Sequence, residues 1–383
     1  MDITIVGPAH PYRGGIAQFN EKLAYSFKDE GDSVRIVNFT VQYPSFLFPG
    51  KTQYTSSPAP EGIVIQRSVS TVCPWTWVRT GRRIAREKPD MLIVRYWMPF
   101  FAPALGTIAR IVSRNGHTKV LALTDNIVPH ERFFFCRRLT RYFLNAVDGV
   151  VYMSKQVSGE LNCIGYRGLK TFSPHPIYDI YGSPVDRTAA CEKLGLLPKY
   201  RYVLFFGFIR DYKGLDLLLD AWSLIAGNGV MSKYKLLVAG EFYNDKKKYM
   251  NQIEKHSLQD RVILSDSYIS DEEVKYYFSV ADLLAQPYRS ASQSGVTQIA
   301  YHFGVPMIVT DVGGLPEIVP HEKVGYVVEG NPEAIADNIL KFVDSNKAEF
   351  FRANIEKEKE RFQWNKLTGT FKKMLINLNS NKR

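Results

Sequence analysis

The residues that most clearly suggest chemistry form a short turn in the second half of the chain. Two cations, Arg210 and Lys213, lie in the stretch Gly207-Phe208-Ile209-Arg210-Asp211-Tyr212-Lys213-Gly214. An apolar run precedes it at 202–206, and apolar residues recur at helical spacing over 215–226. A glycine-bearing turn between a strand and a helix directs backbone N–H groups and the positive end of a helix dipole at one point. We therefore predict a diphosphate site here, with a solvated basic loop as the alternative reading.

Two further turns combine glycine with the start of a predicted helix. Gly14 and Gly15 follow the apolar run 2–7, and bare backbone at a helix N-terminus lets a phosphate or a sugar come close. The alternative there is tight packing of the loop on the helix. The segment 290–298 is rich in small hydroxyl side chains and opens another helix, beyond what a single N-cap needs. We expect it to bind the donor through Gln293, Ser294, Gly295, Thr297 and Gln298.

Tyr268 and Ile269 follow a predicted strand at 261–264. They fall on the same edge of the predicted sheet as Arg210 and Lys213. We expect them to form a wall against a nucleobase, and simple side-chain packing explains the pair equally well.

Polar and titratable residues follow a predicted strand of the first half, 119–124. They include Asp125, His130 and Glu131. Open α/β sheets bind ligands at the carboxyl ends of their parallel strands. We expect Asp125 to orient an acceptor hydroxyl, and His130 with Glu131 to bind or polarise it. The alternative is that Asp125 merely forms a turn and His130 satisfies a backbone carbonyl.

Strands and helices alternate through both halves of the chain, which predicts two parallel sheets. The length of 383 residues also suits two domains. Prolines at positions 174 and 176 stiffen the chain where the first series of strands ends. We therefore expect an N-terminal domain over 1–180 and a C-terminal domain over 181–360. The charged, helical end of the chain, 361–383, is expected to return to the first domain.

The net charge of +11 indicates an anionic partner. Two segments, 75–83 and 132–143, combine arginine with aromatic residues and suit an anionic membrane surface. An ordinary helix with an aromatic core stripe and a wet basic face explains either segment equally well.

Location and metal content follow from simpler observations. The first residues show no signal peptide, and the chain has no apolar stretch long enough to span a membrane. Four scattered cysteines without metal-binding spacing fit free thiols in the cytoplasm. We expect no metal, no cofactor and no nucleic-acid partner.

Over nearly its whole length the chain resembles the family 4 glycosyltransferases. The similar motifs are Gly14-Gly15, Gly207 through Lys213-Gly214, Gly304-x-Pro306 and Gly313-Gly314-Leu315-Pro316-Glu317. The resemblance implies a GT-B fold, which is two Rossmann-like domains facing across a cleft, and a retaining reaction. The family usually has arginine where this chain has Phe208, so Arg210 must supply that charge. Its two glutamates would fall at Ala291 and Ile299, and its histidine at the third strand end is replaced by Asp125.

The resemblance and the residues together predict a cytoplasmic glycosyltransferase, peripheral on the inner face of the plasma membrane. It would move a sugar from a nucleotide-diphosphate sugar to a hydroxyl of a glycan or lipid-linked acceptor, in cell-surface polysaccharide or glycolipid synthesis. Arg210 and Lys213 would stabilise the departing diphosphate without a metal. Two alternatives stay open. One is a nucleotide-sugar epimerase of the same fold, and the other is a non-enzymatic basic module that binds nucleic acid or anionic lipid.

Overall fold

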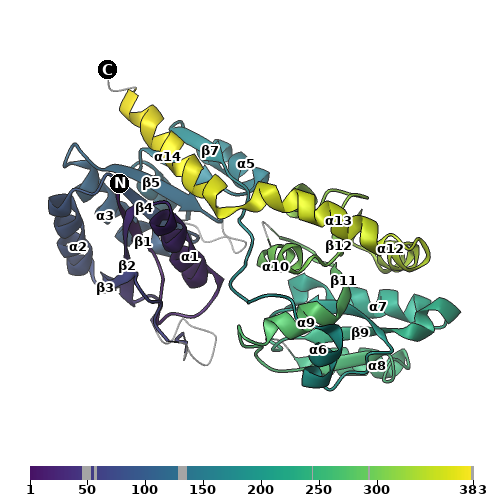
Figure 1. Cartoon of the computed structure of the whole chain (residues 1–383). Coiled ribbons are helices and arrows are strands. Elements are labelled where there is room, and N and C mark those ends of the chain that lie inside the picture. The colour runs from purple at the N-terminus through teal and green to yellow at the C-terminus, as the bar shows by residue number, and fades with distance from the viewer. Residues whose placement is uncertain (45–52, 56–57, 128–135, 244, 292–293, 381–383) are drawn as a thin grey trace. The chain divides into compact units, whose positions relative to one another are not determined.

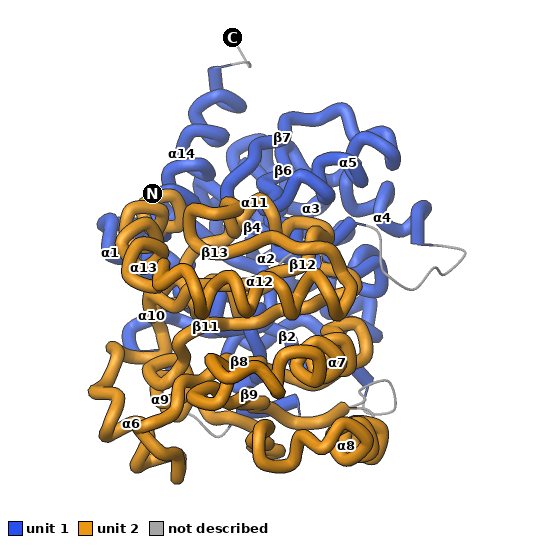
Figure 2. The backbone as a smooth tube through the Cα atoms, turned by 90° about the vertical axis from the view of Figure 1, so that its right-hand side faces the viewer, with its two compact units in different colours: residues 1–174, 364–383 blue, residues 175–363 orange. Residues whose placement is uncertain are grey.

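The computed structural model describes residues 1–44, 53–55, 58–127, 136–243, 245–291 and 294–380. The chain divides into two compact units, which Figure 2 shows in different colours. Unit 1 contains Met1–Pro174 together with Trp364–Arg383, and unit 2 contains His175–Gln363. The first change of unit thus falls beside the prolines at 174 and 176, and the second falls at Trp364.

Unit 1 is built on a seven-stranded parallel sheet in the order β3-β2-β1-β4-β5-β6-β7. Its elements are β1 (Asp2–Val6), α1 (Gly15–Asp29), β2 (Ser33–Val41), β3 (Val64–Ser70), α2 (Pro74–Glu87), β4 (Met91–Tyr96), η2 (Pro99–Phe101), α3 (Ala102–Ser113), β5 (Lys119–Thr124), α4 (Cys136–Leu144), β6 (Gly149–Tyr152), α5 (Lys155–Ile164), β7 (Leu169–Phe172) and, from the far end of the chain, α14 (Trp364–Ser380).

Neighbouring residues of β4 show which helices cover each face of this sheet. Tyr96 stacks on Phe143 of α4 at a ring distance of 4.4 Å. Arg95 points the other way, over the ring of Phe19 in α1 at 4.1 Å. Because side chains alternate between the faces of a strand, α2, α3 and α4 cover one face, and α1 with α14 covers the other. Figure 1 labels α1, α2, α3 and α14, and Figure 2 labels α4. All six residues of β4 are buried, as expected for a parallel strand covered on both faces.

Unit 2 repeats the plan with a six-stranded parallel sheet in the order β10-β9-β8-β11-β12-β13. Its elements are α6 (Arg187–Leu194), β8 (Arg201–Phe206), η3 (Asp211–Lys213), α7 (Leu215–Ile225), η4 (Gly229–Lys233), β9 (Tyr234–Ala239), α8 (Lys246–Lys255), β10 (Val262–Ser265), α9 (Val274–Val280), β11 (Ala281–Gln286), α10 (Gly295–Phe303), β12 (Met307–Thr310), α11 (Leu315–Ile318), β13 (Gly325–Val328), α12 (Pro332–Asp344), α13 (Ala348–Glu358) and η5 (Lys359–Phe362).

Both sheets reverse their strand order beside the first strand of the unit, between β1 and β4 and between β8 and β11. Such a switch point opens a crevice at the carboxyl ends of the strands, where ligands bind in open α/β sheets. The predicted fold class of two Rossmann-like parallel-sheet domains is confirmed, including the return of a C-terminal helix to the first. Within the part of the chain that the structure describes, no helix combines the length and the apolar character needed to cross a membrane.

Candidate functional site

The turn after β8 is held in place by the two neighbouring strand ends. Gly207 adopts a left-handed φ of +95° and donates its N–H to the carbonyl of Ala239 at 2.9 Å. Gly214, at φ +70°, lies so close to the loop after β11 that a Cβ there would stand 2.0 Å from the carbonyl oxygen of Pro287. Both positions therefore need glycine, and the turn between them lies at the switch point of unit 2.

Lys213 is a buried cation at the centre of this turn. Its side chain is 8% exposed, and no carboxylate or hydrogen-bond acceptor of the described residues pairs with its ammonium group. The ammonium lies 5.5 Å from the ring centre of Tyr288 and beside Gly207, where a Cβ would approach it to 2.9 Å. Burial lowers the pKa of Lys213, and the nearby charge of Arg210 lowers it further. An anion bound here would supply the missing counter-charge.

Arg210 is the second cation of the turn without a carboxylate partner among the described residues. Its guanidinium lies 4.2 Å from the ring centre of Tyr243, and its buried Nε has no hydrogen-bond acceptor in the described structure. An unsatisfied buried donor costs free energy, which a ligand oxygen would recover. Phe208, at the position after the glycine, is 37% exposed and carries no charge.

Neighbouring cations of unit 2, by contrast, are already neutralised. Arg289 makes two hydrogen bonds of 2.8 Å to the carboxylate of Asp216, and Lys248 lies 3.4 Å from Asp211. Burial would raise the pKa of Asp216, but the pair with Arg289 outweighs it, and the pKa lies below its ordinary value. Arg289 and Lys248 thus have carboxylate partners, whereas Lys213 and Arg210 have none among the described residues. We therefore take Lys213 and Arg210 as the cations that a ligand would neutralise.

The start of α10 borders the same turn. Val296 lies 3.7 Å from the position of a Cβ on Gly207, and a Cβ on Gly295 would stand 2.9 Å from Tyr178. Ser294 is the N-cap, but its side chain does not cap the helix; its Oγ accepts from Gln286 Nε2 at 2.7 Å instead. The first turn of α10 therefore presents uncapped N–H groups close to Gly207, which itself lies beside the Lys213 ammonium, as an anion site requires.

Not every predicted donor residue reaches this surface. Thr297 is fully buried and its Oγ1 donates to the carbonyl of Ser294. Gln298 is also fully buried, and neither atom of its amide has a partner among the described residues. Gln293 lies outside the described residues.

Tyr268 and Ile269 lie after β10, as predicted, with Tyr268 48% exposed and Ile269 half-buried. Tyr268 lies near Tyr181, whose pKa burial raises well above its usual value, with the nearby Tyr178 adding to the rise. Tyr178 in turn contacts Gly295 of α10. Sequence analysis used the prolines at 174 and 176 only to place the domain boundary. Tyr178 and Tyr181, two tyrosines in four residues, were a signal that this segment packs against a folded surface.

In unit 1, the predicted residues lie at the carboxyl edge of the sheet. Gly14 is exposed at φ +112° and is the N-cap of α1, whose first residue is Gly15. Asp125 follows β5 and makes hydrogen bonds of 2.8 Å and 2.5 Å to the guanidinium of Arg95. Burial raises the pKa of Asp125, and the pair with Arg95 opposes that rise. His130 and Glu131 lie outside the described residues.

Arg95 is a residue of this site that sequence analysis missed. Its side chain is 2% exposed, and its Nη1 has no hydrogen-bond partner in the described part of the chain. The signal was present, because an arginine inside the apolar run of β4 must be paired when both faces of the strand are buried. The structure thus gathers Gly207, Arg210, Lys213 and the start of α10 in unit 2, and Asp125 with Arg95 in unit 1.

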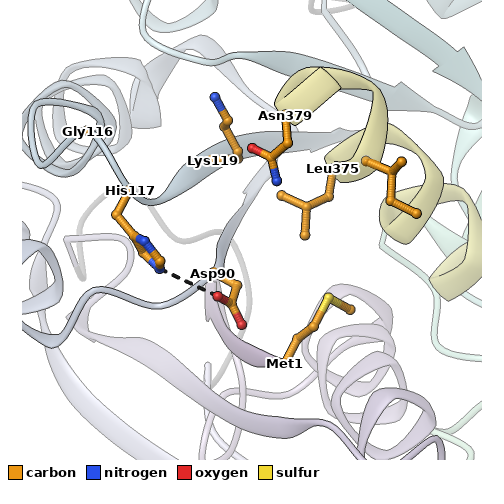
Figure 3. Close-up of a pocket in the computed structure, with 8 residues that line it drawn as sticks. Met1, Asp90, Gly116, His117, Lys119, Leu375 and Asn379 are labelled. Carbon is orange, nitrogen blue, oxygen red and sulfur yellow. Dashed lines mark ion pairs between the residues drawn. The ribbon is translucent and has the colours of Figure 1, made fainter. Parts of the chain in front are cut away.

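A pocket of unit 1 lies elsewhere, away from these residues. It has a volume of about 510 Å³ and is lined by residues at the amino end of the sheet, among them Met1, Asp90 and Lys119 (Figure 3). Asp90 pairs there with His117 at 3.4 Å and accepts the N–H of Asp2 at 2.8 Å, which are structural roles. It contains none of the predicted site residues. No cluster of metal-ligating side chains occurs among the described residues.

Comparison with known proteins finds a family model similar to most of unit 2. Residues 186–361 match the family model described as glycosyl transferases group 1. A D-inositol 3-phosphate glycosyltransferase of Pseudarthrobacter chlorophenolicus is 27% identical over 179 residues, which cover 45% of this chain and 43% of the relative. The lipopolysaccharide core biosynthesis mannosyltransferase LpsB of Rhizobium meliloti is 26% identical over 216 residues, 54% of this chain and 58% of the relative. The chain thus spans about half the length of the curated relatives it matches.

Solved structures resemble the whole chain in fold. Anabaena Alr3699/HepE in complex with UDP aligns with a TM-score of 0.75 at 16% identity, covering 98% of this chain and 100% of the other. A glycosyltransferase from Rickettsia africae aligns with a TM-score of 0.74 at 15% identity, covering 99% of each chain. Identity this low establishes the shared fold alone.

Proposed function

We propose that this protein is a retaining glycosyltransferase that moves a hexose from a nucleotide-diphosphate sugar to a hydroxyl of a glycan or lipid-linked acceptor. The observation that carries the proposal is the pair of cations at the switch point of unit 2, Lys213 and Arg210, which no described carboxylate neutralises. The family match of the same unit and the similarity in fold to a protein solved with UDP support a nucleotide sugar as the ligand.

The chemistry would proceed by charge stabilisation. As the bond between the sugar carbon and the diphosphate oxygen breaks, its electron pair stays on the diphosphate. Lys213, Arg210 and the N–H groups at the start of α10 would hold that growing negative charge, because they are oriented before the reaction begins. Two fixed cations would thus do what a metal does elsewhere, and no metal is part of the proposal.

The acceptor would bind in unit 1. Its hydroxyl oxygen forms the new bond to the sugar and passes its proton to the departing diphosphate. We assign the orientation of this hydroxyl to Asp125, whose carboxylate Arg95 holds in one position. The curated relatives named above include a lipopolysaccharide core mannosyltransferase, which supports a role in cell-surface polysaccharide or glycolipid synthesis. We further propose that the protein works on the cytoplasmic side of the membrane.

Replacing Lys213 tests the proposal directly. The Lys213→Ala variant should lower turnover about a hundredfold or more, since losing one preorganised contact to developing charge typically costs about 3–4 kcal/mol. Lys248→Ala is the matched control, because Lys248 is a nearby lysine that is already paired with Asp211. Equal turnover in the two variants would remove the role given to Lys213.

Two further measurements would identify the nucleotide donor and distinguish a transferase from an epimerase. Thermal shift against UDP, GDP, ADP and their sugars should show stabilisation by one base, because a ligand that binds the folded state raises its melting temperature. Incubation with that sugar nucleotide and no acceptor should leave it unchanged. Conversion of the sugar under these conditions would instead identify an epimerase, and no stabilisation by any nucleotide would leave a non-enzymatic module.

A further inference from the structure

One face of unit 1 is strongly basic, and it belongs to the helices α2, α3 and α4. Helix α3 packs against both α2 and α4, so the three form one layer over the sheet. They contain four arginines in α2, one in α3 and three in α4, with no lysine and a single carboxylate, Glu87. We call this surface the arginine face.

Helix α2 directs one stripe of side chains outward. Trp75, Arg79, Arg82 and Arg86 are spaced by four, three and four residues, which places them on one side of a helix. All four are exposed, and Trp75 has an exposed fraction of 75%. The second tryptophan, Trp77, turns inward and donates its Nε1–H to the carbonyl of Ser70 at 2.6 Å. The core therefore accounts for Trp77 but leaves Trp75 unexplained.

The charge of this stripe is uncompensated. Among the described residues, no carboxylate pairs with Arg79, Arg82 or Arg86. Glu87, the single acidic residue of these helices, already lies 3.7 Å from Arg83 and 3.6 Å from Arg35. Burial lowers the pKa of Arg83, and the charges of Arg35 and Arg79 lower it further against the effect of Glu87. Like charges thus crowd together here, and among the described residues Glu87 is the one carboxylate of these helices that lies close to them.

Helix α4 extends the basic surface. Arg137 and Arg141 donate to main-chain carbonyls, of Cys163 at 2.8 Å and of Ile164 at 3.0 Å, which leaves their charges unbalanced. Arg138 is exposed, with no described carboxylate near it. Arg110 of α3 stacks 3.7 Å from the ring centre of Tyr142, which is itself 38% exposed.

We propose that the arginine face binds the surface of an anionic phospholipid bilayer. Guanidinium groups match phosphate oxygens in a fork geometry that lysine lacks, which explains the exclusive use of arginine. An exposed indole beside them has the amphipathic character of tryptophans at the boundary between headgroups and acyl chains. Basic and aromatic side chains on one helical surface are the pattern of proteins that lie on a membrane.

The arginine face lies where a lipid-linked acceptor could reach the site from a bilayer. This link to the acceptor is the one part of the inference that rests on the proposed function. Helices α2 and α4 follow strands of a parallel sheet, so their first turns lie at the carboxyl edge of that sheet. Gly14 and Asp125 lie at the same edge. A bilayer on the arginine face would therefore bring its headgroups toward the acceptor side of the site.

Vesicle flotation at low salt tests the binding. The protein should float with vesicles of phosphatidylglycerol and phosphatidylcholine, and remain unbound with phosphatidylcholine alone. Each basic side chain near an anionic surface increases partitioning roughly fivefold, so Arg79→Gln/Arg82→Gln/Arg86→Gln should weaken binding roughly a hundredfold. High salt should weaken wild-type binding as well, because it screens exposed charges.

The matched control removes three charges elsewhere. Lys193→Gln/Lys255→Gln/Lys357→Gln changes exposed lysines of unit 2 and should float like the wild type. Trp75→Ala should bind several-fold more weakly and lose the blue shift of tryptophan fluorescence that vesicles cause in the wild type.

Equal flotation of the two triple variants would overturn the proposal. So would wild-type protein that stays unbound at low salt or prefers single-stranded RNA to vesicles. None of these outcomes depends on a nucleotide sugar, so they are separate from the test of the transferase.

Discussion

At the scale of single residues, the distinguishing feature of unit 2 is Lys213, a buried lysine that has no partner among the described residues. A charge held out of water with no counter-charge destabilises the folded protein unless a ligand compensates it. Lys213→Met should therefore raise the stability of the free protein by about 0.5–2 kcal/mol, the usual gain at a site kept strained for function. The same variant should lose the thermal stabilisation that a nucleoside diphosphate gives the wild type. Thermal melts with and without nucleotide measure both effects, and a variant that melts lower and still responds would contradict the argument.

The lowered pKa of Lys213 also predicts how the protein responds to pH. Between the folded and the unfolded pKa of this lysine, the unfolded chain holds a proton that the folded protein has released. The free energy of unfolding should therefore rise with pH across that interval, and the Lys213→Met variant should lack this rise. Nucleotide affinity should change in the opposite direction, since the diphosphate needs the protonated ammonium. Titration calorimetry over this pH range would reveal an affinity that falls as the pH increases.

Arg95 gives a prediction for unit 1. Arg95→Ala would leave the partly buried carboxylate of Asp125 without its partner, and we expect a cost of about 3 kcal/mol, the lower end of the range for buried pairs. Arg79→Ala is the control, since Arg79 is exposed and has no described ion pair, and it should change the stability by less than about 0.5 kcal/mol. Urea unfolding measures the free energy of unfolding of both variants. Similar stabilities for the two would show that the pair with Asp125 contributes little.

At the scale of elements, the turn between β8 and α7 depends on the conformation of its glycines. Gly207→Ala would strain a left-handed backbone by about 1–2 kcal/mol and bring a methyl group within 2.9 Å of the Lys213 ammonium. We expect nucleotide affinity to fall about tenfold or more. Moving the Lys213 ammonium away from the diphosphate needs to cost only about 1.4 kcal/mol of binding free energy to have this effect. Gly227→Ala is the matched control in the same unit, since a Cβ there meets nothing within 4 Å. Calorimetry on both variants checks the expectation, and unchanged affinity in Gly207→Ala would detach the turn from the ligand.

Most elements were predictable because their signals are local. Apolar runs and helical periodicity located β8, α7 and the start of α10 to within a few residues, and Gly207 marked the end of β8. The helical spacing over 215–226 corresponds to α7, and the left-handed φ of Gly214 separates α7 from the short helix η3 before it. Two short strands, β7 and β13, were not predicted. Each has four residues, too few for a periodic pattern to stand out, and pairing with a distant strand is what makes them strands.

At the scale of the whole molecule, α14 completes unit 1 from the other end of the sequence. Phe371 is fully buried, and its ring centre lies 6.2 Å from that of Phe27. The ammonium of Lys372 lies 2.7 Å from a carboxylate oxygen of Glu30 and from one of Asp32. Phe371→Ala should cost about 3–5 kcal/mol through the lost burial and the cavity. Ile376→Ala, on the same helix but 62% exposed, should cost less than about 1 kcal/mol. Denaturant unfolding distinguishes them, and equal losses would mean that α14 is not part of the core of unit 1.

The sequence by itself determined the two series of strands and helices, the proline-marked change of unit, and the turn with its two cations. These features depend on residues close together in the chain, whose spacing is visible without coordinates. Only the tertiary structure decided which charges are neutralised. Arg95 and Asp125 are 30 residues apart, Arg289 and Asp216 are 73 apart, and Thr368 bonds Glu30 across 338. Because an ion pair depends on distance through space, the fold alone separates the cations that serve the structure from Lys213 and Arg210, which remain available to a ligand.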